Sequence, residues 1–345
     1  MPSIYRHPDG VWPNTLALAA TLLAYPAGLG LLLVPGVGWA LACNALGLFL
    51  LVLSLVWSAY FIHEFAHQTI FRSAQANARW GLLMGWLNGS CFARFDDLRR
   101  KHMRHHLERA DVLTFDAKGF LLRSPAWLRR TVVALEWAYF PAVEYLMRAF
   151  VILMPFRAGG TASARLRIVA IALLRLVALA LLAIASPKAL LLYCLAVLIF
   201  ITVLRFADCF QHTYDAYPIL DDRPLPQDEM RDRDYEQANT FTDVAGVSDT
   251  WGHALLNMVW LNFGFHNAHH ERPTVPWHRL PACHRTLYRP DHAQVITVGE
   301  LLHSFHANRI RRIFAQDYGQ VGPFGTPGRA DRFVGAVGVS FLTAV

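Results

Sequence analysis

The chain has 345 residues, 54% of them hydrophobic, and its 32 basic and 25 acidic residues give a formal net charge of +7. The apolar residues are concentrated in long blocks that contain few or no charges, which argues against an ordinary soluble domain. The five cysteines are scattered and form no C-x-x-C pair. They therefore indicate neither a disulfide framework nor a thiolate site for zinc or an iron-sulfur cluster.

Four apolar segments are long enough to cross a membrane as helices. They cover approximately residues 15–34, 39–61, 168–185 and 189–207, and a short turn separates the two members of each pair. A bilayer core needs about 20 apolar residues of helix. We therefore predict an all-α integral membrane protein with four transmembrane helices in two hairpins. The first segment leads directly into another apolar segment and lacks a signal-peptide cleavage site, so we expect the N-terminus to be retained.

Basic residues are distributed unevenly around these segments. They recur between Phe71 and Arg167, whereas the two turns inside the pairs contain a single basic residue, Lys188. The positive-inside rule then places the N-terminus, the middle segment and the C-terminus on the cytoplasmic side. We expect residues 62–166 and 208–345 to form a cytoplasmic helical cap within one domain of residues 1–345. Because topology accounts for the basic excess, we predict no nucleic-acid partner.

Three further apolar segments are predicted not to cross the membrane. Residues 131–156 contain two glutamates, an arginine and a mid-run proline, and a charge at mid-membrane costs at least about 2.5 kcal/mol. We expect a helix or broken helix at the interface there. Residues 80–92 are too short to span and are predicted to be interfacial or re-entrant. Residues 333–345 are also too short, so they can dip into the interface or pack on the body.

The histidines form a repeated pattern. The chain contains HEFAH, HMRHH and HNAHH, which place His63 and His67 four residues apart and give two boxes with offsets of three and four. On a helix these offsets put the side chains on one face, as in a metal-ligand array. These eight residues are His63, His67, His102, His105, His106, His266, His269 and His270.

A ninth ligand is predicted from its position. His212 follows the fourth apolar segment much as His63 follows the second, and Asp208 stands four residues before it. Nine imidazoles are too many for one metal and suit two metals with four or five ligands each. Imidazole ligands suit iron, although ligand type alone also admits zinc or copper. We assign no metal to the other seven histidines.

The first box has a second interpretation. HEFAH satisfies H-E-x-x-H, in which two histidines bind zinc and the glutamate acts as the general base of a peptidase. A zinc intramembrane peptidase would leave the seven other ordered histidines unexplained. The role of Glu64 is therefore open: a peptidase base, a group that orients a ligand ring, or a structural residue.

Membrane topology offers a check on this histidine array. If all three boxes form one site, an even number of crossings must separate the second box from the third. The number is two when residues 131–156 do not span, and three when they do. The array and the charges in that segment thus favour the same topology.

With its three boxes, the chain resembles the membrane fatty acid desaturase family. The long interval between the second and third boxes, which holds an apolar pair, fits that family better than the sterol desaturase and fatty acid hydroxylase group. The prolines in HNAHHERPTVPWHRLP are also similar. The resemblance implies a four-span domain with a di-iron site at the nine histidines. Asp208 stands where some members have an asparagine, and it could bind metal through water or orient a ligand.

The resemblance also implies an activity. We expect two iron ions and O2 to oxidise a fatty acyl chain, supplied as a fatty acid, acyl thioester or lipid, with desaturation as the outcome. Oxidative decarboxylation to a terminal alkene and hydroxylation are the alternatives. The chain has no haem, flavin or iron-sulfur motif, so electrons are expected from a ferredoxin or cytochrome b5 type donor and its reductase. Basic residues near the second box would suit an acidic donor or substrate head group, namely Arg94, Arg99, Arg100, Arg104 and Arg109.

Overall fold

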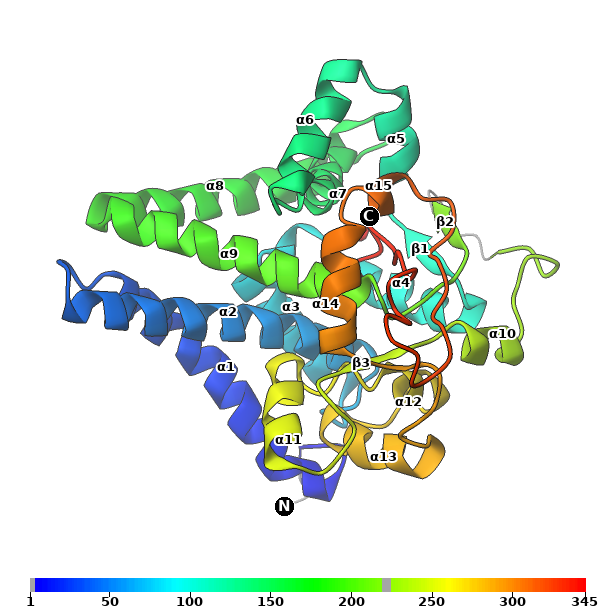
Figure 1. Ribbon diagram of the computed structural model, residues 1–345. Coiled ribbons are helices and arrows are strands. Elements are labelled where there is room, and N and C mark those ends of the chain that lie inside the picture. Colours follow the sequence, from blue (N-terminus) through cyan, green and yellow to red (C-terminus); the bar gives the residue numbers. More distant parts are fainter. Residues whose placement is uncertain (1–3, 219–224) are drawn as a thin grey trace.

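The computed structural model describes residues 4–218 and 225–345 and is mostly helical (Figure 1). Within the described residues, four helices are long and apolar enough to cross a membrane, which confirms the predicted number. They are α1 (Val11–Leu32), α2 (Trp39–Ala66), α8 (Ala162–Ala185) and α9 (Pro187–Asp208). Hydropathy locates only the apolar part of a helix, so the helices extend beyond the predicted segments. For example, α8 begins at Ala162 rather than at residue 168.

The four apolar helices pack in two pairs, each made of helices that are adjacent in the sequence. Helix α1 packs along α2, α8 packs along α9, and α2 also contacts α9. The α1–α2 contact depends on two glycines, because a Cβ on Gly28 would lie 2.9 Å from Gly47 O and a Cβ on Gly47 would lie 2.9 Å from Gly28 O. Small residues allow such close approach between membrane helices. Ser54 adds a hydrogen bond across this contact by donating to Thr21 O at 2.7 Å.

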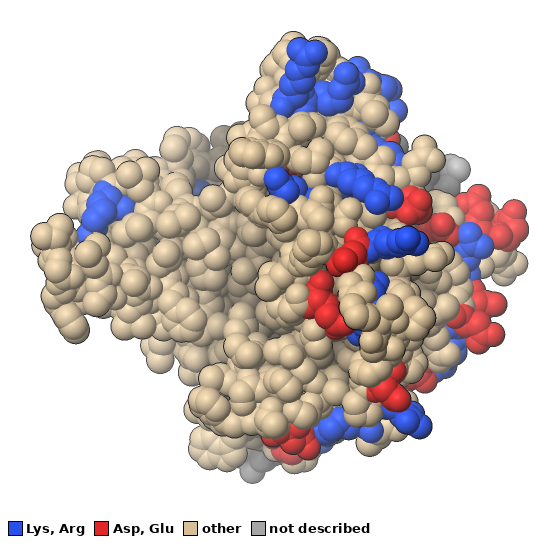
Figure 2. All heavy atoms as spheres, viewed as in Figure 1, with Lys and Arg blue, Asp and Glu red and all other residues tan. Residues whose placement is uncertain are grey.

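Large apolar side chains cover the outside of these helices. On α8, for instance, Leu181 is 62% exposed and Ile184 is 82% exposed. Figure 2 shows that the charged side chains gather on the opposite part of the molecule, whereas the projecting helices are almost free of charge. An exposed apolar surface of this extent is typical of a protein that lies in a membrane.

Most of the remaining described residues form what we call the head region, residues 67–161, 209–218 and 225–345. Its two parallel strand pairs, β1 (Asp111–Leu113) with β2 (Ala216–Pro218) and β3 (Thr242–Val244) with β4 (Val295–Thr297), are short and were not predicted. Neither pair forms a closed sheet. Its helices are α3 (Ala74–Asn88), α4 (Phe95–Glu108), α5 (Ala117–Arg123), α6 (Ala126–Trp137), α7 (Ala142–Leu153), α10 (Arg233–Ala238), α11 (Trp251–Asn257), α12 (His266–Glu271), α13 (Leu280–Leu287), α14 (Val298–Ala307) and α15 (Arg311–Phe314).

The three shorter apolar segments adopt different structures. Residues 131–156 form the end of α6 and all of α7, and Pro141 stands at the break between them. Neither helix is among the four long apolar ones. Residues 80–92 lie in α3 and a short 3-10 helix, and α3 packs on α2. Residues 333–345 are irregular and pack into the protein, with Val334 and Leu342 buried.

Candidate metal centre

All nine predicted histidines come together where α2 and α9 meet the head region. His63 lies in the last turn of α2, His67 follows its end, and His212 follows α9. The second box lies on α4 and the third on α12. The nine rings form two groups, in each of which one nitrogen per ring lies within 4.8 Å of the others. The first group is His63, His67, His102, His106 and His269, and the second is His105, His212, His266 and His270.

Helical spacing explains how the boxes divide between these groups. Residues four apart stay together, as in His102 with His106 and His266 with His270, whereas the remaining ring of each box joins the other group. A step of four residues rotates by slightly more than one helical turn, and a step of three by slightly less. The middle ring of each box therefore points to the other side of the helix face that the three rings share. Boxes two and three consequently each contribute to both groups.

The Nε2 atoms within each group are very close. In the first group, Nε2 of His102 lies 2.7 Å from that of His67 and 3.2 Å from that of His106. In the second, Nε2 of His212 lies 2.9 Å from those of both His266 and His270. Two imidazole nitrogens on adjacent positions of one metal, each about 2.1 Å from it, are about 3 Å apart. The donor set thus fits a metal ion in each group.

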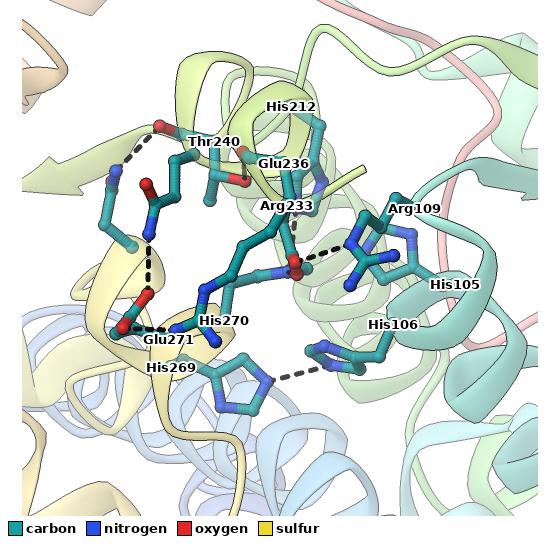
Figure 3. Close-up of polar contacts among 12 residues, drawn as sticks. His105, His106, Arg109, His212, Arg233, Glu236, Thr240, His269, His270 and Glu271 are labelled. Carbon is teal, nitrogen blue, oxygen red and sulfur yellow. Dashed lines mark hydrogen bonds and ion pairs between the residues drawn. The ribbon is translucent and has the colours of Figure 1, made fainter. Parts of the chain in front are cut away.

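A carboxylate and a carbonyl oxygen fix the Nδ1 nitrogens of two of these rings. His270 Nδ1 donates to Glu236 Oε1 at 2.9 Å (Figure 3), and His105 Nδ1 donates to Ala110 O at 2.9 Å. Glu236 also accepts from Arg109 Nε at 2.9 Å. With the proton on Nδ1, each ring presents the Nε2 lone pair to the centre of its group, as ligand histidines do.

Asp111 is a further acid beside the second group. Its Oδ1 lies 3.6 Å from His105 Nδ1 and 3.9 Å from His212 Nδ1, and its side chain is buried. Sequence reasoning missed Asp111 and Glu236. Asp111 follows the second box by five residues and could have been noticed there. Glu236 has no sequence relationship to any box, since only the fold brings α10 to the site.

Glu64 is buried, and one of its two carboxylate oxygens is hydrogen-bonded within the protein. Its Oε2 accepts from Thr69 Oγ1 at 2.6 Å and from Trp277 N at 3.1 Å, and its Oε1 lies 3.6 Å from His63 Nδ1. These contacts join the end of α2 to the loop that follows the third box. They suit a residue that positions the first box.

Burial keeps the ligand candidates neutral. Burial lowers the pKa of His105 and of His270 to about 3, the latter by burial alone and the former also through the neighbouring His270. Burial followed by the proximity of other imidazoles lowers the pKa of His102 and His212 well below the ordinary value. Neutral imidazole is the form that binds metal, so these rings need not lose a proton near neutral pH.

A small cavity of about 50 Å³ lies between the two groups. Rings from both groups line it, together with Asp208, Phe263 and Phe341. The Oδ2 atom of Asp208 is buried and has no hydrogen-bond partner. Asp208 thus lies beside the ligand candidates, as expected from its position before His212.

The segment near residue 341 is held in place by Lys101. Its Nζ donates to Ser340 O at 2.9 Å and to Thr343 O at 2.8 Å. Burial lowers the pKa of Lys101 to about 8, which leaves it charged at neutral pH. The ring of Phe341 then lies 5.9 Å from that of His63 and 6.0 Å from that of His102, between centroids.

The other seven histidines join neither group. His253, for example, bonds Ser248 at 2.6 Å, and His278 lies 3.3 Å from Asp9. The structure therefore brings together the nine histidines that the pattern selected and leaves the rest apart.

Comparison with known proteins agrees with this geometry. The family model described as Fatty acid desaturase matches residues 38–299. The chain belongs to the fatty acid desaturase family. This desaturase-family match includes all three boxes and His212. Comparisons with curated proteins and with solved structures each found no match.

Family membership establishes the general class of this desaturase-family protein. It is an oxidoreductase of fatty acyl chains, and its four apolar helices indicate a membrane protein. Its histidine groups could bind metal, in keeping with a family that is generally metal-dependent.

Proposed function

We propose that the protein is a di-iron enzyme that uses O2 to desaturate a fatty acyl chain. The observation that carries this proposal is the pair of adjacent imidazole groups with converging Nε2 atoms. One iron would be held by His63, His67, His102, His106 and His269, and the other by His105, His212, His266 and His270. When bound, the two irons would supply the O2-dependent removal of hydrogen from the acyl chain.

The protein's own residues would position the ligands and limit access. Glu236 and the Ala110 carbonyl orient two rings of the second group, and Glu64 ties the first box to the loop after the third. Phe263 and Phe341 form apolar walls of the cavity between the groups. One water needs about 10–15 Å³, so a cavity of about 50 Å³ holds only a few atoms of a chain. Phe341 would thus decide which carbons reach the centre.

A larger cavity lies behind this wall and has room for the rest of a substrate. Its volume is about 1030 Å³, and its lining combines Leu113, Val337 and Gly338 with charged residues such as Lys118 and Asp215. The neighbouring residues Val112, Val339 and Phe341 line the small cavity instead. Strand β1 and residues 337–341 therefore separate the two cavities. An acyl chain held in the larger cavity would approach the histidines along this partition.

The membrane arrangement is part of the same proposal. The α1–α2 and α8–α9 pairs would be two transmembrane hairpins, and the head region would be a cytoplasmic cap with both termini on that side. The distribution of basic residues supports this orientation. A single membrane domain would then keep all nine histidines on one side.

Electrons would come from a separate ferredoxin or cytochrome b5 type protein with its reductase. The five arginines first considered for donor binding are largely engaged within the protein. Arg104 pairs with Glu108 at 2.7 Å, Arg109 with Glu236 at 2.9 Å, and Arg100 with Asp97 at 2.5 Å. Because these pairs reduce the local positive charge, the arginines provide weak support for an acidic docking surface.

The decisive test of the reaction is product analysis. Cells that express the chain with a ferredoxin and its reductase would be fed isotope-labelled fatty acids, and products would be separated by gas chromatography. An internal double bond supports desaturation. A hydroxy acid would instead indicate hydroxylation, and an alkene one carbon shorter would indicate decarboxylation. Metal analysis tests the centre separately: about two irons per chain support the proposal, and one zinc without iron contradicts it.

A further inference from the structure

A notch rich in arginine lies away from the histidines, where α9 meets the α6–α7 turn and α14. Its lining includes Thr202 and Arg205 from α9, Tyr139 from the turn, and Arg309 and Arg312. Glu136 is the only acidic residue among the described residues that line it. The notch is therefore positively charged.

Arg205 is buried and incompletely bonded. Its side chain is 5% exposed and its Nη1 pairs with Glu136 Oε2. Its Nε and Nη2 atoms are buried and have no hydrogen-bond partner. Glu136 does not satisfy them: its Oε2 pairs with Nη1 of Arg205, and its Oε1 accepts from Val143 N at 2.9 Å.

Arg312 shows the same deficit. It is 3% exposed, and its Nε donates to Val334 O at 2.6 Å. The guanidinium lies against the rings of Phe210 and Phe305, with its Cζ 5.2 Å and 4.9 Å from their centroids. Its Nη2 atom is buried and unpartnered. An aromatic face contributes some attraction for a cation but accepts no conventional hydrogen bond.

The charges in the notch do not balance. Glu136 can neutralise one of the two buried guanidinium groups, and Arg309 at the rim adds a third positive charge. A buried charge without a counter-charge is strongly unfavourable. Arginine also cannot relieve the cost by losing its proton, because its pKa is far above neutral. An oxyanion in the notch would supply both the charge and the acceptors for the unpartnered N–H groups.

The position of the notch favours a membrane lipid as the source. Thr202 belongs to one of the four long apolar helices. At the rim, Trp137 and Tyr139 are 63% and 43% exposed, and Arg309 stacks on both rings. Exposed tryptophan and tyrosine are typical of the membrane–water boundary. Basic pockets between membrane helices bind anionic head groups there.

We propose that this notch binds the phosphate of an anionic phospholipid head group. Its volume of about 10 Å³ is about that needed for one oxygen atom. One phosphate oxygen would therefore enter between Arg205 and Arg312, and the rest of the head group would lie beside Arg309. The acyl tails would follow the exposed apolar surface of α9.

The test measures lipid binding rather than enzyme activity. The purified full-length protein would be placed in detergent with phosphatidylglycerol or phosphatidylcholine, and retained lipid would be measured by native mass spectrometry. Phosphatidylglycerol should bind at least tenfold more tightly, because the choline of the other lipid already neutralises its phosphate. Arg312→Gln should remove most of this preference, and Arg309→Gln should reduce it severalfold. Arg130→Gln, an exposed change on α6 outside the notch, should leave it intact.

Several outcomes would overturn the proposal. The first is equal binding of the two lipids to the unmodified protein. The second is an unchanged preference of Arg309→Gln for phosphatidylglycerol, which is informative even if Arg312→Gln does not fold. A third is complete displacement of phosphatidylglycerol by inorganic phosphate, which would assign the notch to free phosphate. Loss of fatty acid retention in Arg309→Gln, with the retention of phosphatidylglycerol unchanged, would assign the notch to a carboxylate.

Discussion

The Nε2 atoms of His67 and His102 lie 2.7 Å apart, although 35 residues separate the two histidines in the chain. Both rings are held neutral by burial, which lowers the pKa of each well below its ordinary value. Two lone pairs at this distance repel unless a proton or a cation lies between them. The same relationship recurs in both groups, so each group could hold a metal ion.

The first prediction concerns the ninth ligand. His212→Ala should reduce bound iron from about two to about one per chain and abolish product formation, as His105→Ala should, because both rings belong to the same group of four. Iron would be measured by mass spectrometry of the purified protein. His253→Ala is the matched control, since His253 contacts Ser248 and lies in neither group. Full iron content in His212→Ala would show that this ring is not a ligand.

The second prediction concerns the acid behind the second group. Glu236→Ala removes the acceptor that orients His270 and should weaken iron binding at that centre by about 10- to 100-fold, as for other acids that support a ligand histidine. Chelator competition would measure the affinity. Glu271→Ala is the control, because Glu271 contacts Arg233 and Gln237 rather than a ligand ring. Equal affinity in the two variants would refute this role for Glu236.

The sequence contains most of the information about the ligand candidates. Offsets of three and four residues are local properties of a helix, so the pattern in HMRHH and HNAHH predicts rings on a shared face. The position of His212 after an apolar segment likewise depends only on where that helix ends. The four apolar helices can be read in the same way, because their length is set by the thickness of a bilayer.

The rest of the site depends on contacts between distant segments. Glu236 meets His270 across 34 residues, and Lys101 holds Thr343 across 242 residues. No local pattern encodes such pairs. The short strands were missed for a related reason, since three residues are too few to show an alternating pattern. Phe341 could be assigned to an apolar segment but not to the wall of a cavity.

The third prediction concerns Phe341. Phe341→Ala should enlarge the cavity between the two groups and shift the position of oxidation or the preferred chain length, without loss of iron. Because Phe341 is only partly buried, the loss of stability should be about 2 kcal/mol, below the 3–5 kcal/mol of a fully buried phenylalanine. Product distributions from saturated fatty acids of several lengths would be compared. Phe324→Ala, at a residue 53% exposed, is the control. An unchanged distribution would mean that Phe341 does not limit access.

The fourth prediction concerns acid stability and uses His284, which lies outside the two histidine groups. His284 is 1% exposed, its ring nitrogens have no partner, and burial lowers its pKa to about 4. The unfolded chain takes up this proton near pH 6.5, whereas the folded protein does so only near pH 4. The contribution of neutral His284 to the free energy of unfolding is therefore fully present above about pH 6.5. It falls with decreasing pH, by about 2 kcal/mol at pH 5. His284→Phe keeps the ring's volume and removes the titration, so its melting temperature should fall less than that of the unmodified protein between about pH 7.5 and pH 5. His303→Gln, at an exposed position, should show the original acid sensitivity, and an equal fall in His284→Phe would exclude His284 as its source.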